Sequence, residues 1–289
     1  MDKAKSRKLG RFTLHALNAG SQRLDGGAMF GVVPKPLWQK KIAPDERNRI
    51  PLALRPLLVE TGDSLILIDT GVGNKDDAKF REIYGIENAG DPTALEEAIR
   101  EAGFRPADVG LVINTHLHFD HAGGNTLGQP DGSAVPAFPG VRHVVQRTEW
   151  EFAHLQNERI RASYLLANLD PVYEAGLFDF ADGEAEILPG IRVLPTPGHT
   201  PGHQSVLMES EGESALYVAD LVPTAAHLPL PWIMGYDVEP LVTLDTKRVV
   251  LERVKRERTL LIFEHDPEIS WGYLAPRDPK PTLVAKRPD

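Results

Sequence analysis

The sequence predicts an α+β fold in which sheets pack together and are covered by helices. Eight short runs rich in Val, Ile and Leu, each bounded by Gly, Pro, Asp or Asn, are typical of strands. Helical patterns lie between only some of these runs, so the chain lacks the regular alternation expected of a doubly wound parallel sheet. The predicted strands cover residues 52–59, 64–68, 109–114, 141–146, 191–194, 204–208, 214–219 and 259–263.

Three helices are predicted between the strands. Thr93 and Glu96 form a capping-box pattern at the start of the first helix, and Gly103 closes it. The stretch Thr-Glu-Trp-Glu at 148–151 predicts a second helix that begins in the same way. A third helix is predicted from about 240 to 258, because its apolar residues form a stripe along one face. That stripe consists of Leu241, Leu244, Val250, Leu251 and Val254.

Size and composition favour one globular domain over residues 1–289. The chain is 42% hydrophobic and 25% charged, and no linker-like stretch interrupts the predicted elements. The Pro-rich, charged segment 275–289 is expected to be a loosely held tail. The formal net charge of −9 argues against a nucleic-acid partner, because phosphate-binding surfaces are basic.

The residue types that the chain lacks limit its chemistry and location. It contains no Cys, which excludes disulfides, thiol catalysis and thiolate metal ligands. Any metal must therefore be bound by nitrogen and oxygen. No run approaches the ~18 apolar residues of a membrane span, and no apolar core of a signal peptide follows the basic start. We expect a cytoplasmic protein with no membrane partner.

A cluster of metal-binding residue types follows the third predicted strand. The stretch "THLHFDHAGG" at 115–124 places His116, His118, Asp120 and His121 on a loop that leaves a strand end. Residues two apart in extended backbone point the same way, so the first two histidines can bind one ion while the Asp and the third His turn toward another. Three of the chain's ten histidines within six positions are more typical of a metal site than of a core.

The other ligands that such a site needs lie at later strand ends. His199 stands in "PTPGHTPGH", Asp220 ends the run "SALYVAD", and His265 follows "LLIFE". One sheet edge would bring these residues together with the cluster. Five histidines and two aspartates then make two sites, and Asp220 is the natural bridge because a carboxylate has two oxygens. The remaining histidines considered, which we expect to be structural or solvated, are His15, His143, His154 and His203.

This HxHxDH pattern, followed in order by His, Asp and His, resembles the metallo-β-lactamase superfamily from about residue 10 to 270. The resemblance implies a four-layer αβ/βα sandwich and two divalent metal ions, zinc first, with manganese, iron or cobalt as alternatives. Asp69, in "LILIDTGVG", is expected to support the ligand loop from behind. The resemblance implies that His116, His118 and His199 bind one ion, that Asp120, His121 and His265 bind the other, and that Asp220 bridges them.

The 22–50 segment resembles the N-acyl-homoserine-lactone lactonase-like branch, which includes quorum-quenching members. It mixes glycines with apolar residues, among them Met29, Phe30 and Trp38, which are the expected substrate contacts. An apolar loop of this kind could wall a pocket for an acyl chain. Alternatively it packs against a second subunit, which would make a homodimer, or covers the core. β-Lactamases of this fold commonly place Cys where this chain has Asp220, and the chain lacks the extra domains of the nuclease and flavodiiron branches.

The resemblance implies a hydrolase that opens lactones, N-acyl-homoserine lactones first, through a hydroxide that bridges the two metals. Asp120 is expected to carry the proton to the leaving alkoxide. Lactonases of this branch place a Tyr shortly after the bridging Asp, whereas this chain has Pro223 and Thr224 there. His227, seven residues past Asp220, is a candidate for part of that polar catalytic role, and the alternative is a structural histidine. The alternatives are a phosphotriesterase or arylesterase of the methyl parathion hydrolase type and, in another class, a non-catalytic metal-binding protein.

Overall fold

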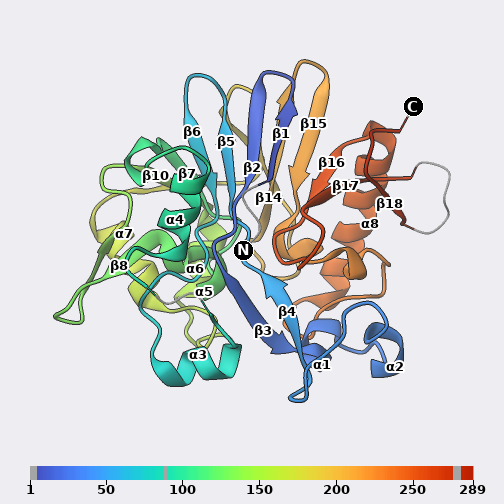
Figure 1. The fold of residues 1–289 in the computed structure, drawn as a ribbon, viewed down its shortest axis with the longest axis horizontal. Coiled ribbons are helices and arrows are strands. Elements are labelled where there is room, and N and C mark those ends of the chain that lie inside the picture. Colours follow the sequence, from blue (N-terminus) through green and yellow to red (C-terminus); the bar gives the residue numbers. More distant parts are fainter. Residues whose placement is uncertain (1–4, 88–89, 276–280, 289) are drawn as a thin grey trace. The chain divides into compact units, whose positions relative to one another are not determined.

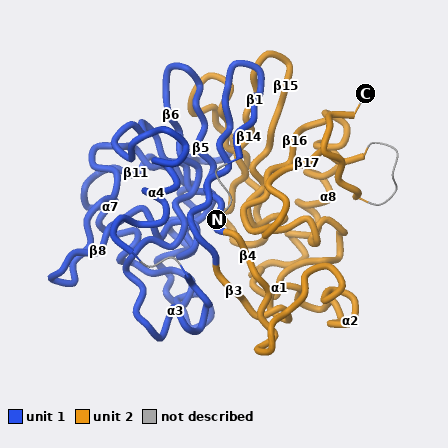
Figure 2. The backbone as a smooth tube through the Cα atoms, viewed as in Figure 1, with its two compact units in different colours: residues 1–21, 54–183 blue, residues 22–53, 184–289 orange. Residues whose placement is uncertain are grey.

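A computed structural model describes residues 5–87, 90–275 and 281–288. The chain forms two compact units, which Figure 2 distinguishes by colour. Unit 1 comprises residues 1–21 and 54–183, and unit 2 comprises 22–53 and 184–289. The 22–50 segment thus belongs to unit 2, although it lies early in the chain. A single domain over residues 1–289 stays a prediction.

Unit 1 contains a mixed seven-stranded sheet with the strand order β1-β2-β5-β6-β7-β10-β11 (Figure 1). The pairs from β1 to β6 are antiparallel, and those from β6 to β11 are parallel. The central strands β6 and β7 are buried along their whole length, which explains their continuous apolar sequences. The strands of this unit are β1 (Lys5–Leu9), β2 (Phe12–Ala16), β5 (Leu57–Glu60), β6 (Leu65–Ile68), β7 (Leu111–Ile113), β10 (Arg142–Gln146), β11 (Phe178–Ala181) and the separate pair β8 (Thr126–Gly128) and β9 (Ala134–Pro136).

Helix α4 (Ala94–Glu101) confirms the first predicted helix and its capping box. Thr93 Oγ1 accepts a hydrogen bond from the Glu96 backbone N–H at 3.2 Å, and the Glu96 carboxylate accepts one from the Thr93 N–H at 2.8 Å. The apolar face of α4 packs on Leu67 and Val112 of the sheet. The other helices of unit 1 are α3 (Ala78–Tyr84), α5 (Phe119–Ala122), α6 (Arg147–Ala153), α7 (Asp170–Glu174) and the 3-10 helices η1 (Pro106–Asp108), η2 (Gly123–Asn125) and η3 (Leu166–Asn168).

Unit 2 contains a second seven-stranded sheet, in which β12 to β18 follow in chain order. All its pairs are antiparallel except β15 with β16, where α8 (Pro240–Glu257) forms the connection. Helix α8 confirms the third predicted helix, and its Leu251 and Val254 pack on Leu216 and Leu261 of the sheet. The strands are β12 (Ala185–Leu188), β13 (Ile191–Pro195), β14 (Gln204–Ser210), β15 (Glu213–Tyr217), β16 (Leu260–Ile262), β17 (Trp271–Leu274) and β18 (Leu283–Val284), with the 3-10 helices η4 (Ala219–Leu221) and η5 (Ala225–His227).

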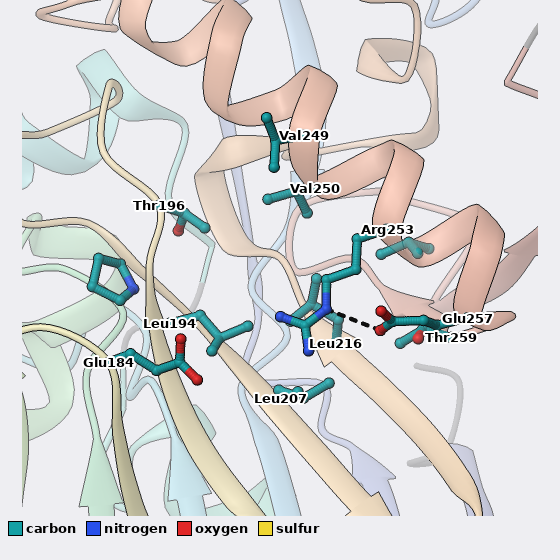
Figure 3. A pocket seen from close by; sticks show the side chains of 12 residues that line it. Glu184, Leu194, Thr196, Leu207, Leu216, Val249, Val250, Arg253, Glu257 and Thr259 are labelled. Atoms are coloured by element: carbon teal, nitrogen blue, oxygen red, sulfur yellow. Dashed lines mark hydrogen bonds and ion pairs between the residues drawn. The ribbon is translucent and has the colours of Figure 1, made fainter.

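A cavity of about 170 Å³ lies between α8 and this sheet. Figure 3 shows Val249 and Val250 of the helix and Leu194 of β13 among the side chains that line it, with the ion pair of Arg253 and Glu257 at one side. None of the candidate metal, catalytic or substrate residues lines this cavity.

The early part of unit 2 corrects one predicted strand. Residues 52–59 were expected to form a single strand, but β4 (Arg49–Ala53) and β5 (Leu57–Glu60) are separate and belong to different units. The break falls at Pro56, which has no N–H to donate to a ladder and restricts the residue before it. Strand β4 pairs instead with β3, and two short helices lie between them. These elements are β3 (Ser21–Asp25), α1 (Gly26–Phe30) and α2 (Lys35–Trp38).

The predicted tail at 275–289 is partly held in the sheet. Strand β18 pairs with β17, with Tyr273 opposite Val284 and Leu274 opposite Leu283. Residues 276–280 and 289 of the predicted tail lie outside the described residues. Among the helices that the structure describes, none has the length and apolar character needed to cross a membrane.

Buried His143 in β10 predicts acid sensitivity of unit 1. Its Nδ1–H donates to the Val141 carbonyl at 3.0 Å, and burial lowers its pKa from 6.5 to about 4. The unfolded state therefore binds a proton between pH 6.5 and 4 that the folded state does not, so stability falls as the pH drops through this window. His143 should contribute roughly 3 kcal/mol to that loss, at about 1.4 kcal/mol per pKa unit.

We expect His143→Gln, which cannot titrate here, to lose unfolding free energy less steeply between pH 6.5 and 4 than the wild type. Urea unfolding at half-unit pH intervals measures both slopes. Parallel slopes would contradict the assignment.

Candidate metal centre

The four predicted ligands of unit 1 form a tight cluster where β7 leads into α5. His116 Nε2 lies 3.1 Å from His118 Nδ1, and the rings of His116 and His121 are 3.9 Å apart between centroids. Asp120 Oδ1 lies 4.0 Å from His121 Nε2. All but half-buried His118 are buried. Unit 1 therefore presents three imidazoles and one carboxylate within a few ångströms of one another.

Asp69 holds this ligand loop from behind. Its Oδ1 accepts the Thr115 N–H at 2.7 Å, and its Oδ2 accepts both the Thr115 hydroxyl at 2.7 Å and the His121 Nδ1–H at 3.0 Å. Because the Thr115 hydroxyl proton goes to Asp69, its oxygen accepts from His116 Nδ1–H at 3.1 Å. The protons of His116 and His121 thus lie on Nδ1, which leaves Nε2 of each ring as the nitrogen that can bind a metal.

Glu149 is a second support of the same loop, although its sequence pattern predicted a role in capping a helix. The capping box predicted at 148–151 is wrong: α6 begins at Arg147, and no side chain caps it. The Glu149 side chain is fully buried instead, and its Oε1 accepts the Leu117 N–H at 3.0 Å and the Tyr164 hydroxyl at 2.8 Å. The backbone between the two histidines of the HxH pair is therefore fixed by a carboxylate from α6.

The glycines that end the motif allow the following backbone to pack closely. A Cβ at Gly123 would lie 2.3 Å from the Val72 carbonyl oxygen, and one at Gly124 would lie 2.3 Å from that of Thr70. Lys75 Nζ donates to the Gly123 carbonyl at 2.7 Å, beside this contact. The "DTGVG" and "HAGG" stretches are thus joined through their backbones.

The three predicted ligands of unit 2 also come together, with Asp220 at their centre. His199 Nε2 lies 3.2 Å from Asp220 Oδ2, and His265 Nε2 lies 3.3 Å from Asp220 Oδ1. All three side chains are buried. They come from the loop after β13, from η4 and from the loop after β16. Each oxygen of one carboxylate therefore faces a different imidazole.

Hydrogen bonds within unit 2 fix the protons of these two histidines. His199 Nδ1–H donates to Asp237 Oδ1 at 2.9 Å, and His265 Nδ1–H donates to the Ala53 carbonyl at 2.8 Å. In the neutral rings both Nε2 atoms are acceptors, and they face carboxylate oxygens, which are also acceptors. A cation that both groups can ligate satisfies this arrangement, and the N/O donor set suits zinc, manganese, iron or cobalt. The residues present therefore fit a divalent metal.

His227 is buried, and both of its ring nitrogens are engaged within unit 2. Nε2–H donates to the Met29 carbonyl at 2.8 Å, and Nδ1 accepts the Thr224 hydroxyl at 2.8 Å. The ring stacks on Phe30 at 4.5 Å, and burial lowers its pKa to about 3. These contacts keep the ring neutral and tie it to the 22–50 segment. They favour a structural role for His227 over the catalytic role that the sequence suggested.

The three expected substrate contacts form the core of the 22–50 segment. Met29, Phe30 and Trp38 are each at most 2% exposed, and Phe30 stacks on Trp38 with centroids 5.2 Å apart. Other side chains of the same segment face outward, since Val32 is 94% and Leu37 51% exposed. The aromatic residues therefore shape the segment from within.

Several supporting residues could not be found from the sequence. Asp237, Glu149 and the Ala53 carbonyl lie 38, 32 and 212 positions from the residues they hold. Nothing in their local sequence distinguishes them from ordinary loop and helix residues. The supporting role of Asp69 was expected only because the "LILIDTGVG" stretch resembles the strand and Asp-Thr-Gly turn of the superfamily.

The comparisons with known proteins agree with this geometry. The family model of the metallo-β-lactamase superfamily matches residues 56–265. An N-acyl homoserine lactonase from Bacillus thuringiensis is 33% identical over 222 residues, which cover 73% of this chain and 80% of that protein. The predicted resemblance to the lactonase-like branch is confirmed.

Two solved structures share the fold. A probable metal-dependent hydrolase from Staphylococcus aureus is 31% identical, with a TM-score of 0.89 over 98% of this chain and 99% of that one. An N-acyl homoserine lactone hydrolase, with the product N-hexanoyl-L-homoserine bound at its catalytic metal centre, is 27% identical, with a TM-score of 0.67 over 92% and 95%. The predicted α+β fold class and the predicted hydrolase activity are confirmed. The chain belongs to the metallo-β-lactamase superfamily.

Proposed function

We propose that the half-sites of the two units together bind two divalent metal ions, zinc first, and that the protein hydrolyses lactones. The observation that carries this proposal is the carboxylate of Asp220, each of whose oxygens faces an imidazole nitrogen that carries no proton. Such a group can bridge two ions. The order of the seven motif residues in the sequence, shared with the superfamily, supports assigning the cluster of unit 1 to the same centre.

The chain's own residues would hold and orient this centre. His116, His118 and His199 would bind one ion, and Asp120, His121 and His265 the other. When bound, two such ions polarise a carbonyl and make hydroxide available at neutral pH. Asp69 and Asp237 keep the Nδ1 protons of their histidines in place, so that Nε2 stays a ligand.

Asp120 is the candidate for proton transfer. It lies in the unit 1 cluster, 4.0 Å from His121 Nε2, and a carboxylate can take up and release a proton. We propose that it takes the proton released on attack and delivers it to the ring oxygen that leaves as the lactone opens. The product is then a hydroxy acid.

The substrate class we propose is the N-acyl-homoserine lactones, which would make the protein a quorum-quenching enzyme. Similar proteins are named N-acyl homoserine lactonases. The 22–50 segment supplies apolar surface of the kind that binds an acyl chain. Met29, Phe30 and Trp38 would determine the shape of that surface. A cytoplasmic location and a homodimer remain predictions.

A hydrolysis screen with matched metal forms tests this function. We expect the chelator-treated protein to be inactive, and zinc, cobalt or manganese to restore hydrolysis of N-acyl-homoserine lactones measured by proton release. Simple γ- and δ-lactones should be poorer substrates, because they lack an acyl chain to bury.

Paraoxon-like phosphotriesters provide the comparison for the alternative activity. If they are hydrolysed with the higher kcat/KM, the proposed substrate class is wrong although the metal centre stands. A folded, metal-loaded protein that is inactive on every ester would indicate a non-catalytic metal-binding protein.

A further inference from the structure

Lys247 is a lysine buried in the middle of α8, and it is 1% exposed. Burial lowers its pKa to about 7, so an amine at this position costs folding free energy. An apolar residue of similar length would pack without that cost. The cost of burying the amine can be offset only by the hydrogen bonds that it forms there.

The amine holds two backbone carbonyls of one loop. Lys247 Nζ donates to the carbonyl oxygens of Pro229 at 3.0 Å and Trp232 at 2.9 Å. Both belong to the 228–239 loop, "LPLPWIMGYDVE", which is irregular and rich in Pro and Gly. An irregular loop has few backbone partners of its own, so these two bonds supply part of its order.

One end of this loop determines the position of a metal ligand. Asp237 of the loop accepts the His199 Nδ1–H, and the Val238 N–H donates to the His199 carbonyl at 3.1 Å. Helix α8 also holds the turn before His199 directly, because Thr246 Oγ1 donates to the Pro197 carbonyl at 2.9 Å. The orientation of His199 thus depends on α8 both directly and through the loop.

The middle of the loop packs on the 22–50 segment. The Gly235 N–H donates to the Ala28 carbonyl at 2.7 Å, and Trp232 meets Phe30 edge to face at 5.7 Å. Met234 is buried in the same apolar cluster as Phe30. The loop is therefore the physical connection within unit 2 between the His199 ligand and the segment proposed to bind the acyl chain.

We propose that Lys247 is a positioning residue whose two hydrogen bonds fix the 228–239 loop, and that it thereby sets the orientation of His199 and the packing of the 22–50 segment. The consequence for His199 concerns metal binding alone. The consequence for acyl-chain selection rests on the proposed lactonase function.

Lys247→Met keeps an unbranched side chain one atom shorter and removes the hydrogen-bond donors. Arg248→Met is the matched control on the exposed side of the same helix. We expect Lys247→Met to bind zinc about tenfold more weakly in chelator competition. This is the smaller end of the loss in metal affinity seen when a residue that supports a ligand is removed. Backbone amides of residues 228–239 should lose protection from hydrogen exchange, and the absorption spectrum of the cobalt form should change. KM for long-chain lactones should rise more than kcat falls.

Lys247→Arg keeps hydrogen-bond donors on a longer side chain at the same helix position, and it decides the question if the Met variant does not fold. We expect it to retain the fold while shifting the loop, with intermediate zinc affinity and exchange. Zinc affinity, cobalt spectrum and loop exchange equal to those of Arg248→Met in every folded Lys247 variant would overturn the proposal. If the wild type hydrolyses no lactone, the proposed function fails, while the metal and exchange measurements still decide the role of Lys247.

Discussion

Asp220→Asn should abolish the paired metal site and lower kcat/KM for lactone hydrolysis by more than about 100-fold. Loss of a hydrogen-bond partner of a metal ligand typically lowers metal affinity or activity 10- to 100-fold, and loss of a bridging ligand should cost more. Asn keeps the size of Asp but offers one acceptor oxygen and no charge, so it cannot face both His199 and His265 as a ligand. Metal content by mass spectrometry and steady-state kinetics measure the two effects.

Asp245→Asn provides the control for this change. It removes the same charge from unit 2 at a carboxylate that is 76% exposed on α8 and paired only with Arg248 among the contacts described for it. We expect full metal content and wild-type kinetics. Unchanged metal content and kcat/KM in Asp220→Asn would show that this carboxylate is not a bridge.

The candidate metal-binding groups could be predicted because their chemistry is visible in the sequence. His116 to His121 lie within six consecutive positions, and His199, Asp220 and His265 lie at the ends of apolar runs that could be recognised as strands. Residue type and spacing are enough for such ligands, since few other roles bring three histidines and a carboxylate together.

The supporting residues other than Asp69 were not predictable, because their role depends on how distant segments pack. Glu149 fitted a capping box, a local pattern, but it is buried against Leu117 instead. Tertiary packing thus overrode the local signal. His227 was considered for a role at the substrate because of its position in the chain, and no local pattern predicts the hydrogen bonds that its ring forms with Thr224 and Met29.

The burial of Phe30 and Trp38 shows the same limit. An apolar segment with glycines predicts either a pocket wall or a packed core, and the sequence pattern is the same for both. Gly26 decides between them locally, because a Cβ there would lie 2.3 Å from the Trp38 ring. The missing Cβ of Gly26 leaves the space into which the Trp38 indole packs.

Asp69→Asn should be the most damaging change in unit 1 outside the ligands themselves. Asp69 is fully buried, has a φ of +58° and accepts three hydrogen bonds, two from Thr115 and one from His121. An amide presents an NH₂ group to at least one of these donors, which leaves buried donors unsatisfied at about 1–3 kcal/mol each. The His121 proton would also lose its acceptor, so zinc affinity should fall about 10- to 100-fold. Urea unfolding and chelator competition measure the two losses.

Asp63→Asn, on the exposed turn between β5 and β6 of the same unit, is the control for this change. It makes the same chemical change without burial, and we expect unfolding free energy and zinc affinity to stay at wild-type values. If Asp69→Asn loses stability but binds zinc normally, the carboxylate holds Thr115 and the loop but does not orient His121. If it loses zinc affinity at unchanged stability, its bond to His121 is the one that matters, and the bonds to Thr115 are dispensable for folding. A joint loss is expected, because one carboxylate holds both the backbone of the ligand loop and the proton of a ligand.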